Sequence, residues 1–444
     1  MLVLPGKFSA QIHNYKFMKS PAGLKKNLAF MGFSTVLRLG TGILTFAILA
    51  RLLGPESFGV LMLWLSVSAL LSIITNYGLT PYVLREIGAN PASAEAIINE
   101  GLTGKLFLSA LVFACAIVAA WGFEFELKQV FLCLLVASVA DTFSEFLNAG
   151  FRARDRFDAE TRIATATSFS HAVIVTGVVF VQPTVEAAAL AYAASRLVVL
   201  AITVPAVARY FAAPRLADIG VSITRLRKSI NYAIDFGFQS LFGQIDSVVL
   251  NYFIGPVAVG LHQAGMRVFQ GGATAVQVLA NVFLPRAAAK EKSATAFGEE
   301  SMRIQMAFLA FGAAFGIALG IFSGPIVQIL FGPAYGDLVE LLPLFGLLFF
   351  VRFAAAAWGV VLTAGGEQRY RTFATIAHWI LIGGIASILV PGMGIAGWLI
   401  AVIIGNGLLG FLYALRGARR VNSPWKVVAM TVVAGIAFMP ILHN

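Results

Sequence analysis

The hydrophobic residues of this chain gather in long runs, and polar positions are confined to short breaks between them. Each run has roughly the 20 residues that an α-helix needs to cross the hydrocarbon core of a bilayer. We count thirteen runs, whose cores are 29–50, 58–79, 103–122, 128–148, 162–181, 187–207, 231–254, 258–284, 306–330, 341–364, 372–390, 395–416 and 425–442. The pattern predicts an all-α polytopic membrane protein.

Composition supports this fold class. Hydrophobic residues make up 59% of the chain and charged residues 12%, whereas about a quarter of a soluble domain is charged. The first 28 residues hold five lysines and no continuous apolar core, so we do not interpret them as a cleaved signal peptide. Met18 is an alternative start.

The positive charge of the chain indicates its topology. If the N-terminus is cytoplasmic, nearly all lysines and arginines between the runs fall on the inner side, including Arg85, Lys105 and those of 209–228. Only Arg51 and Lys128 fall on the outer side. This asymmetry follows the positive-inside rule. We therefore expect a cytoplasmic N-terminus, and no nucleic-acid partner despite the net charge of +11.

Two short breaks indicate an internal repeat. The stretch "GPESFG" at 54–59 recurs as "GPVAVG" at 255–260. Glycine can end one helix in the left-handed conformation and proline suits the first turn of the next, so each stretch predicts a tight outer hairpin. Segments 1 and 2 then correspond to segments 7 and 8, giving two six-helix bundles. The predicted parts are a basic N-terminal segment 1–28, lobes 29–208 and 231–416, a basic linker 209–230, and an additional C-terminal helix 417–444.

These stretches also carry a family resemblance. The quoted patterns are "ARLLGPESFG", "NYGLTPYVLRE", "GFRARDRFD", "GQIDSVVLNYFIGPVAVG", "FLPRAAA" and "LFGPAYGD", in this order. Over nearly its whole length the chain resembles the polysaccharide transporters (O-antigen and exopolysaccharide flippases) of the multidrug, oligosaccharidyl-lipid and polysaccharide exporter superfamily. The resemblance implies two six-helix lobes around a central cavity that opens alternately to each side. The thirteenth segment departs from the twelve or fourteen spans common in this superfamily.

Eight ionisable residues fall within predicted spans: Arg38, Asp141, Glu145, Arg196, Asp235, Asp246, Arg267 and Arg352. Each costs about 3 kcal/mol at the bilayer centre, so we expect them to face the bundle interior. Glu145 and Asp235 lie within about one turn of the inner helix ends. The remaining, deeper residues are the four arginines and two aspartates, Asp141 and Asp246. Guanidinium groups bind phosphate oxygens bidentately, so a cationic lumen suits an anionic lipid head group.

The candidate substrate-binding residues are Arg38, Arg267, Arg196 and Arg352. Arg38 and Arg267 come first, because the resemblance implies that segments 1, 2, 7 and 8 line the cavity. The alternative is that the arginines pair with the aspartates and carbonyl groups and hold helices together.

The candidate ion-coupling residues are Asp246, Asp141, Asp235 and Glu145. The spacing places Asp235 and Asp246 on one face of segment 7, and makes Asp141 and Glu145 neighbours on segment 4. A buried carboxylate can carry a proton or bind sodium, but these residues can also serve as ion-pair partners.

The leading hypothesis is a flippase for polyprenyl-pyrophosphate-linked oligosaccharide, with the bilayer and polysaccharide polymerase and chain-length machinery as further partners. The alternative is a cation-coupled multidrug exporter of the same superfamily. An enzyme is disfavoured, because the outer loops are short and no nucleophile–base set or metal motif occurs. We expect no cofactor.

Overall fold

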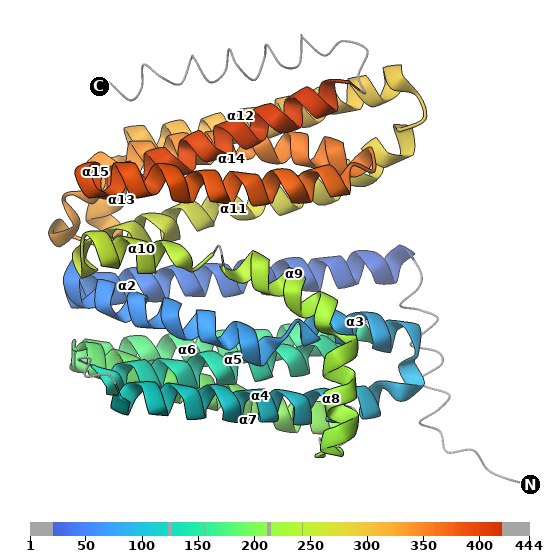
Figure 1. Ribbon diagram of the computed structural model, residues 1–444, viewed down its shortest axis with the longest axis vertical. Helices are drawn as coiled ribbons and strands as arrows, with labels where there is room; N and C mark the ends of the chain where they lie inside the picture. Colours follow the sequence, from blue (N-terminus) through green and yellow to red (C-terminus); the bar gives the residue numbers. More distant parts are fainter. Residues whose placement is uncertain (1–20, 123–126, 155, 211–214, 242, 420–444) are drawn as a thin grey trace, which may run out of the picture. The chain divides into compact units, whose positions relative to one another are not determined.

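The computed structural model describes residues 21–122, 127–154, 156–210, 215–241 and 243–419, and they lie almost entirely in helices (Figure 1). No strand occurs in these ranges. Within them, nine helices are long and apolar enough to cross a membrane, and the structure accounts for all of the first twelve predicted segments as helices. The thirteenth predicted segment lies outside the described residues.

The packing divides the chain into two compact units. The first holds the residues up to Thr45 together with Leu63–Asp246, and the second holds Phe46–Met62 and the residues from Ser247 onward. The division by packing therefore passes through predicted segments 1 and 2. The lobes 29–208 and 231–416 follow the sequence order of the repeat and stay a prediction.

The first unit consists of antiparallel helices joined by short turns (Figure 1). Its elements are the two outer parts of α2 (Pro21–Asn76), α3 (Leu79–Ala89), η1 (Pro91–Ser93), α4 (Ala94–Gly122), α5 (Lys128–Ala153), α6 (Phe157–Val181), α7 (Val185–Tyr210), α8 (Ile219–Lys228) and α9 (Ile230–Leu241). α8 lies within the predicted linker and is capped by Asp218, whose side chain accepts hydrogen bonds from the amides of Gly220 and Val221. Arg225 of α8 forms an ion pair with Glu100 of α4, which fastens the linker to this unit.

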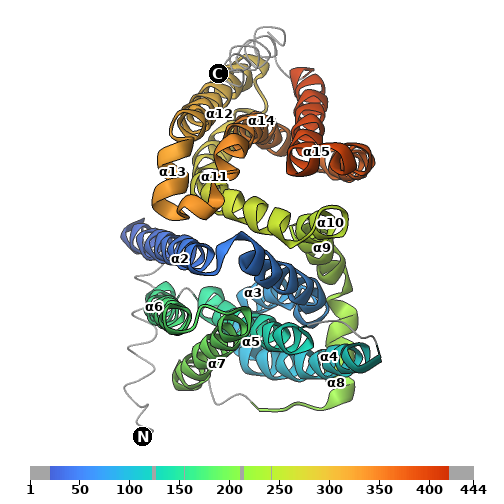
Figure 2. The ribbon, with the colours of Figure 1, turned by 90° about the vertical axis from the view of Figure 1, so that its left-hand side faces the viewer.

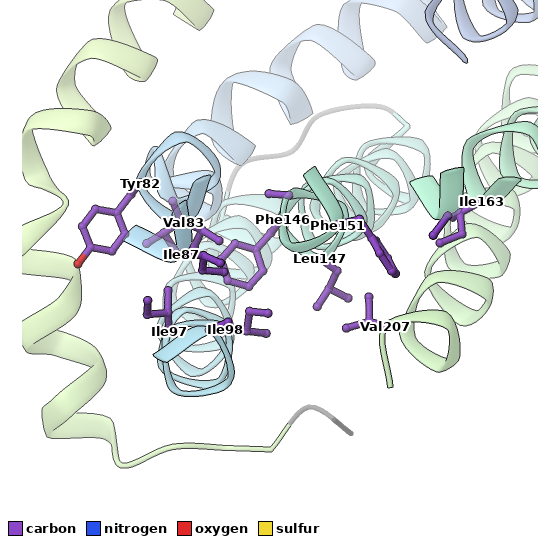
Figure 3. Packing of buried hydrophobic residues seen from close by; sticks show 14 of the residues in the cluster. Tyr82, Val83, Ile87, Ile97, Ile98, Phe146, Leu147, Phe151, Ile163 and Val207 are labelled. Carbon is purple, nitrogen blue, oxygen red and sulfur yellow. The ribbon is translucent and has the colours of Figure 1, made fainter. Parts of the chain in front are cut away.

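The core of the first unit forms around the short helix α3. Its apolar positions recur three to four residues apart, so Leu79, Val83 and Ile87 share one buried face. Figure 3 shows this face meeting Ile97 and Ile98 of α4 and Phe146 of α5. A Cβ at Gly101 would lie 2.6 Å from the Phe146 ring, so α4 and α5 approach each other closely because this position has no side chain.

The second unit is built from the middle of α2 and from the C-terminal helices. These are α10 (Ile245–Phe253), α11 (Pro256–Lys290), α12 (Ala294–Ile321), α13 (Ser323–Leu330), η2 (Pro333–Tyr335), α14 (Leu338–Ala364) and α15 (Gln368–Ala418). Predicted segments 11 and 12 are the two arms of α15, which bends at Gly394 (φ 59°); Figure 2 shows both arms. The ring centroid of Phe349 on α14 lies 4.4 Å from those of Phe315 on α12 and Phe353 on α14. The contact with Phe315 joins α12 to α14.

The two Gly-Pro stretches break the helices at the predicted glycines, but with an extended ψ in place of the predicted left-handed helical conformation. Gly54 (φ 76°) and Gly255 (φ 112°) both adopt a positive φ with an extended ψ, and a proline follows each. The third Gly-Pro break repeats this conformation at Gly332 (φ 82°). Only glycine takes up such a conformation without strain. The sequence repeat is therefore also a repeat in backbone conformation.

The two hairpins pack directly against each other within the second unit. A Cβ added at Gly59 would lie 1.8 Å from the carbonyl oxygen of Pro256, and one added at Gly260 would lie 2.0 Å from that of Pro55. The contact is reciprocal: the glycine of each hairpin lies against the proline carbonyl group of the other hairpin. The last glycine of each hairpin motif is thus required for close backbone contact.

Arg51 connects the first hairpin with the third Gly-Pro break. Its Nη1 donates a hydrogen bond of 3.0 Å to the carbonyl oxygen of Ile329, near the C-terminal end of α13. It thereby satisfies a carbonyl group at a helix end, where helical donors run out.

Ion pairs connect helix ends at the C-terminal end of α11, opposite its Gly-Pro hairpin. Lys290 Nζ lies 2.7 Å from Glu300 of α12, and Arg416 at the end of α15 lies 3.0 Å from Glu367 at its beginning. The second unit is therefore fastened by backbone contact at its hairpins and by charge here.

Three predicted segments are interrupted in the structure. Segment 9 breaks at Phe322, between α12 and α13. Segment 2 breaks where Tyr77 (φ 49°) and Gly78 (φ 60°) take left-handed conformations between α2 and α3. Segment 7 breaks between Leu241 and Ile245. The prediction that Asp235 and Asp246 share one face of a continuous helix is therefore wrong, because they lie on separate helices.

Replacing Gly59 or Gly260 by alanine should destabilise the protein. Each new Cβ would overlap a backbone carbonyl, and overpacking of this kind costs about 1–3 kcal/mol. The thermal unfolding midpoint of the purified protein measures the effect. The control is Gly42→Ala in α2, where nothing lies within 4 Å of the added Cβ. Equal midpoints for all three variants would contradict the contact.

Candidate functional site

Arg196 and Asp141 form an ion pair in the first unit. Arg196 Nη1 of α7 lies 2.7 Å from Asp141 Oδ1 of α5, and its Nη2 donates to the Tyr192 hydroxyl at 3.2 Å. The guanidinium also lies 5.2 Å from the Tyr192 ring centroid. For these two residues the structure shows the helix-pairing arrangement that we had kept as the alternative.

A second polar contact adjoins this pair. His171 of α6 is buried, and its Nδ1 lies 2.7 Å from the Ser195 hydroxyl of α7. Its ring packs edge-on against Tyr192, with 4.8 Å between centroids. Together with the ion pair, this contact joins α5, α6 and α7 through polar groups whose partners lie within the unit.

Arg38 and Glu145 are exposed on the surface of the first unit. Arg38 lies on α2, and Glu145 lies one turn beyond Asp141 on α5. The charges of Arg38, Arg152, Lys105 and Asp141 all act on the Glu145 carboxylate. No ion pair of Arg38 or Glu145 closer than 4 Å occurs in the described part of the chain. Both groups therefore remain accessible to a ligand.

Arg267 rests on an aromatic ring in the second unit. Its guanidinium on α11 lies 3.8 Å from the ring centroid of Phe46, and its Nη1 donates to Gln270 Oε1 at 3.2 Å. A ring face attracts a cation without neutralising it. The Phe46 ring and Gln270 are therefore two of the groups that hold the Arg267 guanidinium.

Arg352 has a similar environment on α14. Its guanidinium lies 5.6 Å from the centroid of the buried Phe269 ring, and its charge acts on the buried ring of His378. Among the residues that the structure describes, no carboxylate lies within ion-pair distance of Arg352. Its donors are therefore not used by an acidic partner.

The two segment 7 aspartates differ in what the structure shows. Asp246 is half-buried in the first turn of α10, where a carboxylate meets the positive end of the helix. The next residue, Ser247, accepts a hydrogen bond of 2.8 Å from Gln263 of α11. Asp235 lies in α9, but its side chain is outside the described residues. No group of three or more metal-ligating side chains occurs among the residues that the structure describes.

Lys105 was misplaced by the sequence analysis. We had counted it with the inner loop charges, whereas the structure places it inside α4 with its side chain fully buried. Its position within the predicted run 103–122 was the available signal. The four candidate arginines are divided equally between the units: Arg38 and Arg196 lie in the first, and Arg267 and Arg352 in the second.

Comparison with known proteins identifies the family. Residues 24–289, more than half of the chain, match the family described as "Polysaccharide biosynthesis protein". The chain belongs to this family. No curated protein matches this member of the polysaccharide biosynthesis family.

Solved structures show the fold of this polysaccharide biosynthesis family member. An inward-facing multidrug resistance MATE family transporter of the MOP superfamily is 17% identical with a TM-score of 0.68, covering 88% of this chain and 96% of that one. An outward-facing MATE family structure is 19% identical with a TM-score of 0.57 and covers 90% and 97%. A MOP superfamily transporter from Pyrococcus furiosus, described as having a binding pocket of reverse polarity, is 18% identical with a TM-score of 0.55, covering 90% of this chain and 96% of that one. The chain is thus a multi-pass membrane protein with the MOP superfamily fold.

Separating Arg196 from Asp141 should destabilise the first unit. We expect Arg196→Gln or Asp141→Asn to reduce stability by about 1–3 kcal/mol, between the values for exposed and buried pairs. The exchange Arg196→Asp with Asp141→Arg should recover part of the loss, measured by thermal unfolding. An exchange variant no better than the worse single variant would show that the pair does not couple these helices.

Proposed function

We propose that the protein is a flippase that moves polyprenyl-pyrophosphate-linked oligosaccharide across the bacterial inner membrane by alternating access. Membership of the polysaccharide biosynthesis family supports a glycan-related substrate. The similarity to inward- and outward-facing MATE structures supports a fold that can take both states. The N-terminus is cytoplasmic in this proposal, as the distribution of lysine and arginine predicts.

The observation that carries the proposal is the environment of Arg352. An arginine within a predicted span is costly unless it is paired or has a functional role. The Arg352 guanidinium packs on Phe269 and forms no ion pair with a described residue. Such a group can offer two parallel N–H donors to a phosphate. We therefore propose that Arg352 binds the pyrophosphate head group. Arg38 and Arg267 remain candidate substrate-binding residues.

Arg196 has a different role in this proposal. Because Asp141 engages it at 2.7 Å, a phosphate would have to displace a carboxylate partner. We propose that Arg196 orients α7 against α5 and contributes less to substrate binding than Arg352 does. The carboxylates Asp141, Glu145, Asp235 and Asp246 remain candidates for ion coupling.

The alternative function is a cation-coupled multidrug exporter. The named MATE structures favour it in fold, and the exposed Glu145 is the feature that suits an organic cation. Arg352, which has no ion-pair partner among the described residues, opposes it, since a fixed positive charge repels cationic drugs. We also propose the polysaccharide polymerase and chain-length machinery as partners, because a flipped glycan must be polymerised on the outer face.

The test is complementation of a flippase-null strain that accumulates the cognate lipid-linked oligosaccharide. Wild-type protein should restore surface glycan. Arg352→Gln should lower the transport rate about tenfold or more, because hydrogen bonds to charged groups contribute about 1.5–3 kcal/mol. Arg352→Lys should keep part of the rate, since it retains the charge but not the bidentate geometry.

The matched control is Arg369→Gln, which removes an exposed arginine near the beginning of α15. It should transport like wild type at equal expression. If wild type fails with the cognate substrate, the proposed function is wrong. If wild type and Arg352→Gln transport equally well, the function stands and the assignment of Arg352 is wrong.

A further inference from the structure

A lysine is buried in the first unit without an acidic partner in contact with it. Lys105 has no exposed surface, and within the described ranges no carboxylate lies within 4 Å of its Nζ. The charge of Glu145 acts on it from α5, the same helix as its contact residue Thr142. Burying an ammonium group is costly unless other groups replace its water. The surroundings of Lys105 should therefore show what replaces that water.

The Lys105 ammonium is surrounded by oxygen atoms and aromatic rings. Nζ donates to the Thr75 carbonyl oxygen at 2.9 Å and to Thr142 Oγ1 at 3.2 Å. Thr142 already donates its own proton to the Val139 carbonyl, so its oxygen can only accept from Lys105. The Phe143 and Phe146 rings lie 5.2 and 5.7 Å from Nζ. Two acceptors and two ring faces favour a protonated amine.

The acceptor from α2 stands at a helix break. In a continuous helix the amide of Leu79 would donate to the Thr75 carbonyl, but Tyr77 and Gly78 turn the chain, and Leu79 begins α3. The donor that the structure shows for the Thr75 carbonyl is Lys105. Thr80 and Asn76 add buried side-chain oxygen atoms with no hydrogen-bond partner in the described chain. The end of α2 therefore presents negative partial charge to a site that water does not reach.

We propose that Lys105 is a tethered cation, whose ammonium group fills a primary-ammonium site at the break between α2 and α3 and so positions α3. The first unit thereby carries its own cation at this place. This inference goes beyond the proposed flippase activity, because it concerns how a broken span is held and which ligand class its site accepts.

The position of α3 has a consequence at the surface of the unit. α3 carries Arg85, whose Nη1 donates to the Tyr232 hydroxyl of α9 at 3.2 Å. A Cβ at Gly78 would lie 2.3 Å from the Tyr232 carbonyl oxygen, so α9 approaches the break itself. Lys105 is therefore a positioning residue for α3 and, through it, for the contact between α3 and α9.

The experiment measures the break directly in the full-length protein in nanodiscs. Spin labels are placed on cysteines introduced at Ile74 and Ala89, exposed positions on the two sides of the break, after Cys115 and Cys133 are replaced by serine. The distance distribution is recorded for wild type, Lys105→Ala and Lys105→Met. Lys128→Met, which removes an exposed lysine at the start of α5, is the matched control.

We expect a narrow distribution for wild type and the control. Lys105→Met keeps the side-chain length but leaves the Thr75 carbonyl without its donor, so its distribution should broaden or shift. A Lys105→Met distribution identical to that of wild type, with an unchanged unfolding midpoint, would overturn the proposal. This variant also carries the test if Lys105→Ala does not fold.

Added amine then tests the ligand class. Methylammonium should narrow the Lys105→Ala distribution and raise its unfolding midpoint as its concentration rises, because a ligand that binds only the folded state stabilises it. Equal concentrations of sodium or tetramethylammonium should not. A response to all three salts alike, or to none, would contradict an ammonium site. Since no glycan is used, these outcomes are independent of the flippase test.

Discussion

The constraint that governs this protein is that lipid supplies no hydrogen-bond partners. Every break in a membrane-spanning helix leaves carbonyl and amide groups that the chain itself must satisfy. Arg51 donates to the carbonyl of Ile329 near the end of α13, and Lys105 donates to that of Thr75 near the end of α2. In both cases a cationic side chain from another helix replaces the missing backbone donor. Arg51 and Lys105, which the sequence analysis counted among the charges between the runs, thus supply the hydrogen bonds that broken helices lack in an apolar medium.

The two units use their arginines differently. In the first unit, Arg196 is engaged by Asp141 and Tyr192. In the second unit, Arg267 and Arg352 lie against the rings of Phe46 and Phe269. The ion pair offsets the charge of Arg196, whereas among the described residues no carboxylate lies within ion-pair distance of Arg352. The arginine environments thus differ between the two units, while both repeated Gly-Pro hairpins lie in the second unit.

The helices could be predicted from sequence because the length of an apolar run nearly determines a span, and the Gly-Pro turns could be predicted because few residues adopt their conformation. The break at Tyr77 could not be predicted, since tyrosine is not a residue that signals a positive φ. Lys105 was missed because α4 begins at Ala94, well before the apolar run, which carries the lysine into the interior. Ion-pair partners such as Asp141 for Arg196 depend on which faces of α5 and α7 meet, and a single sequence does not contain that.

The reciprocal contact between the hairpins is made by backbone atoms of Gly59, Gly260 and the two prolines, with no charged group taking part. The far end of α11 is held instead by the pairs Lys290–Glu300 and Arg416–Glu367. Dissolved salt screens partly exposed charges over about 8–10 Å at physiological ionic strength, but it does not weaken close packing. Rising ionic strength should therefore loosen one end of the second unit and leave the other unchanged, so the salt concentration on each side of the membrane acts unequally on the two ends of the same helices.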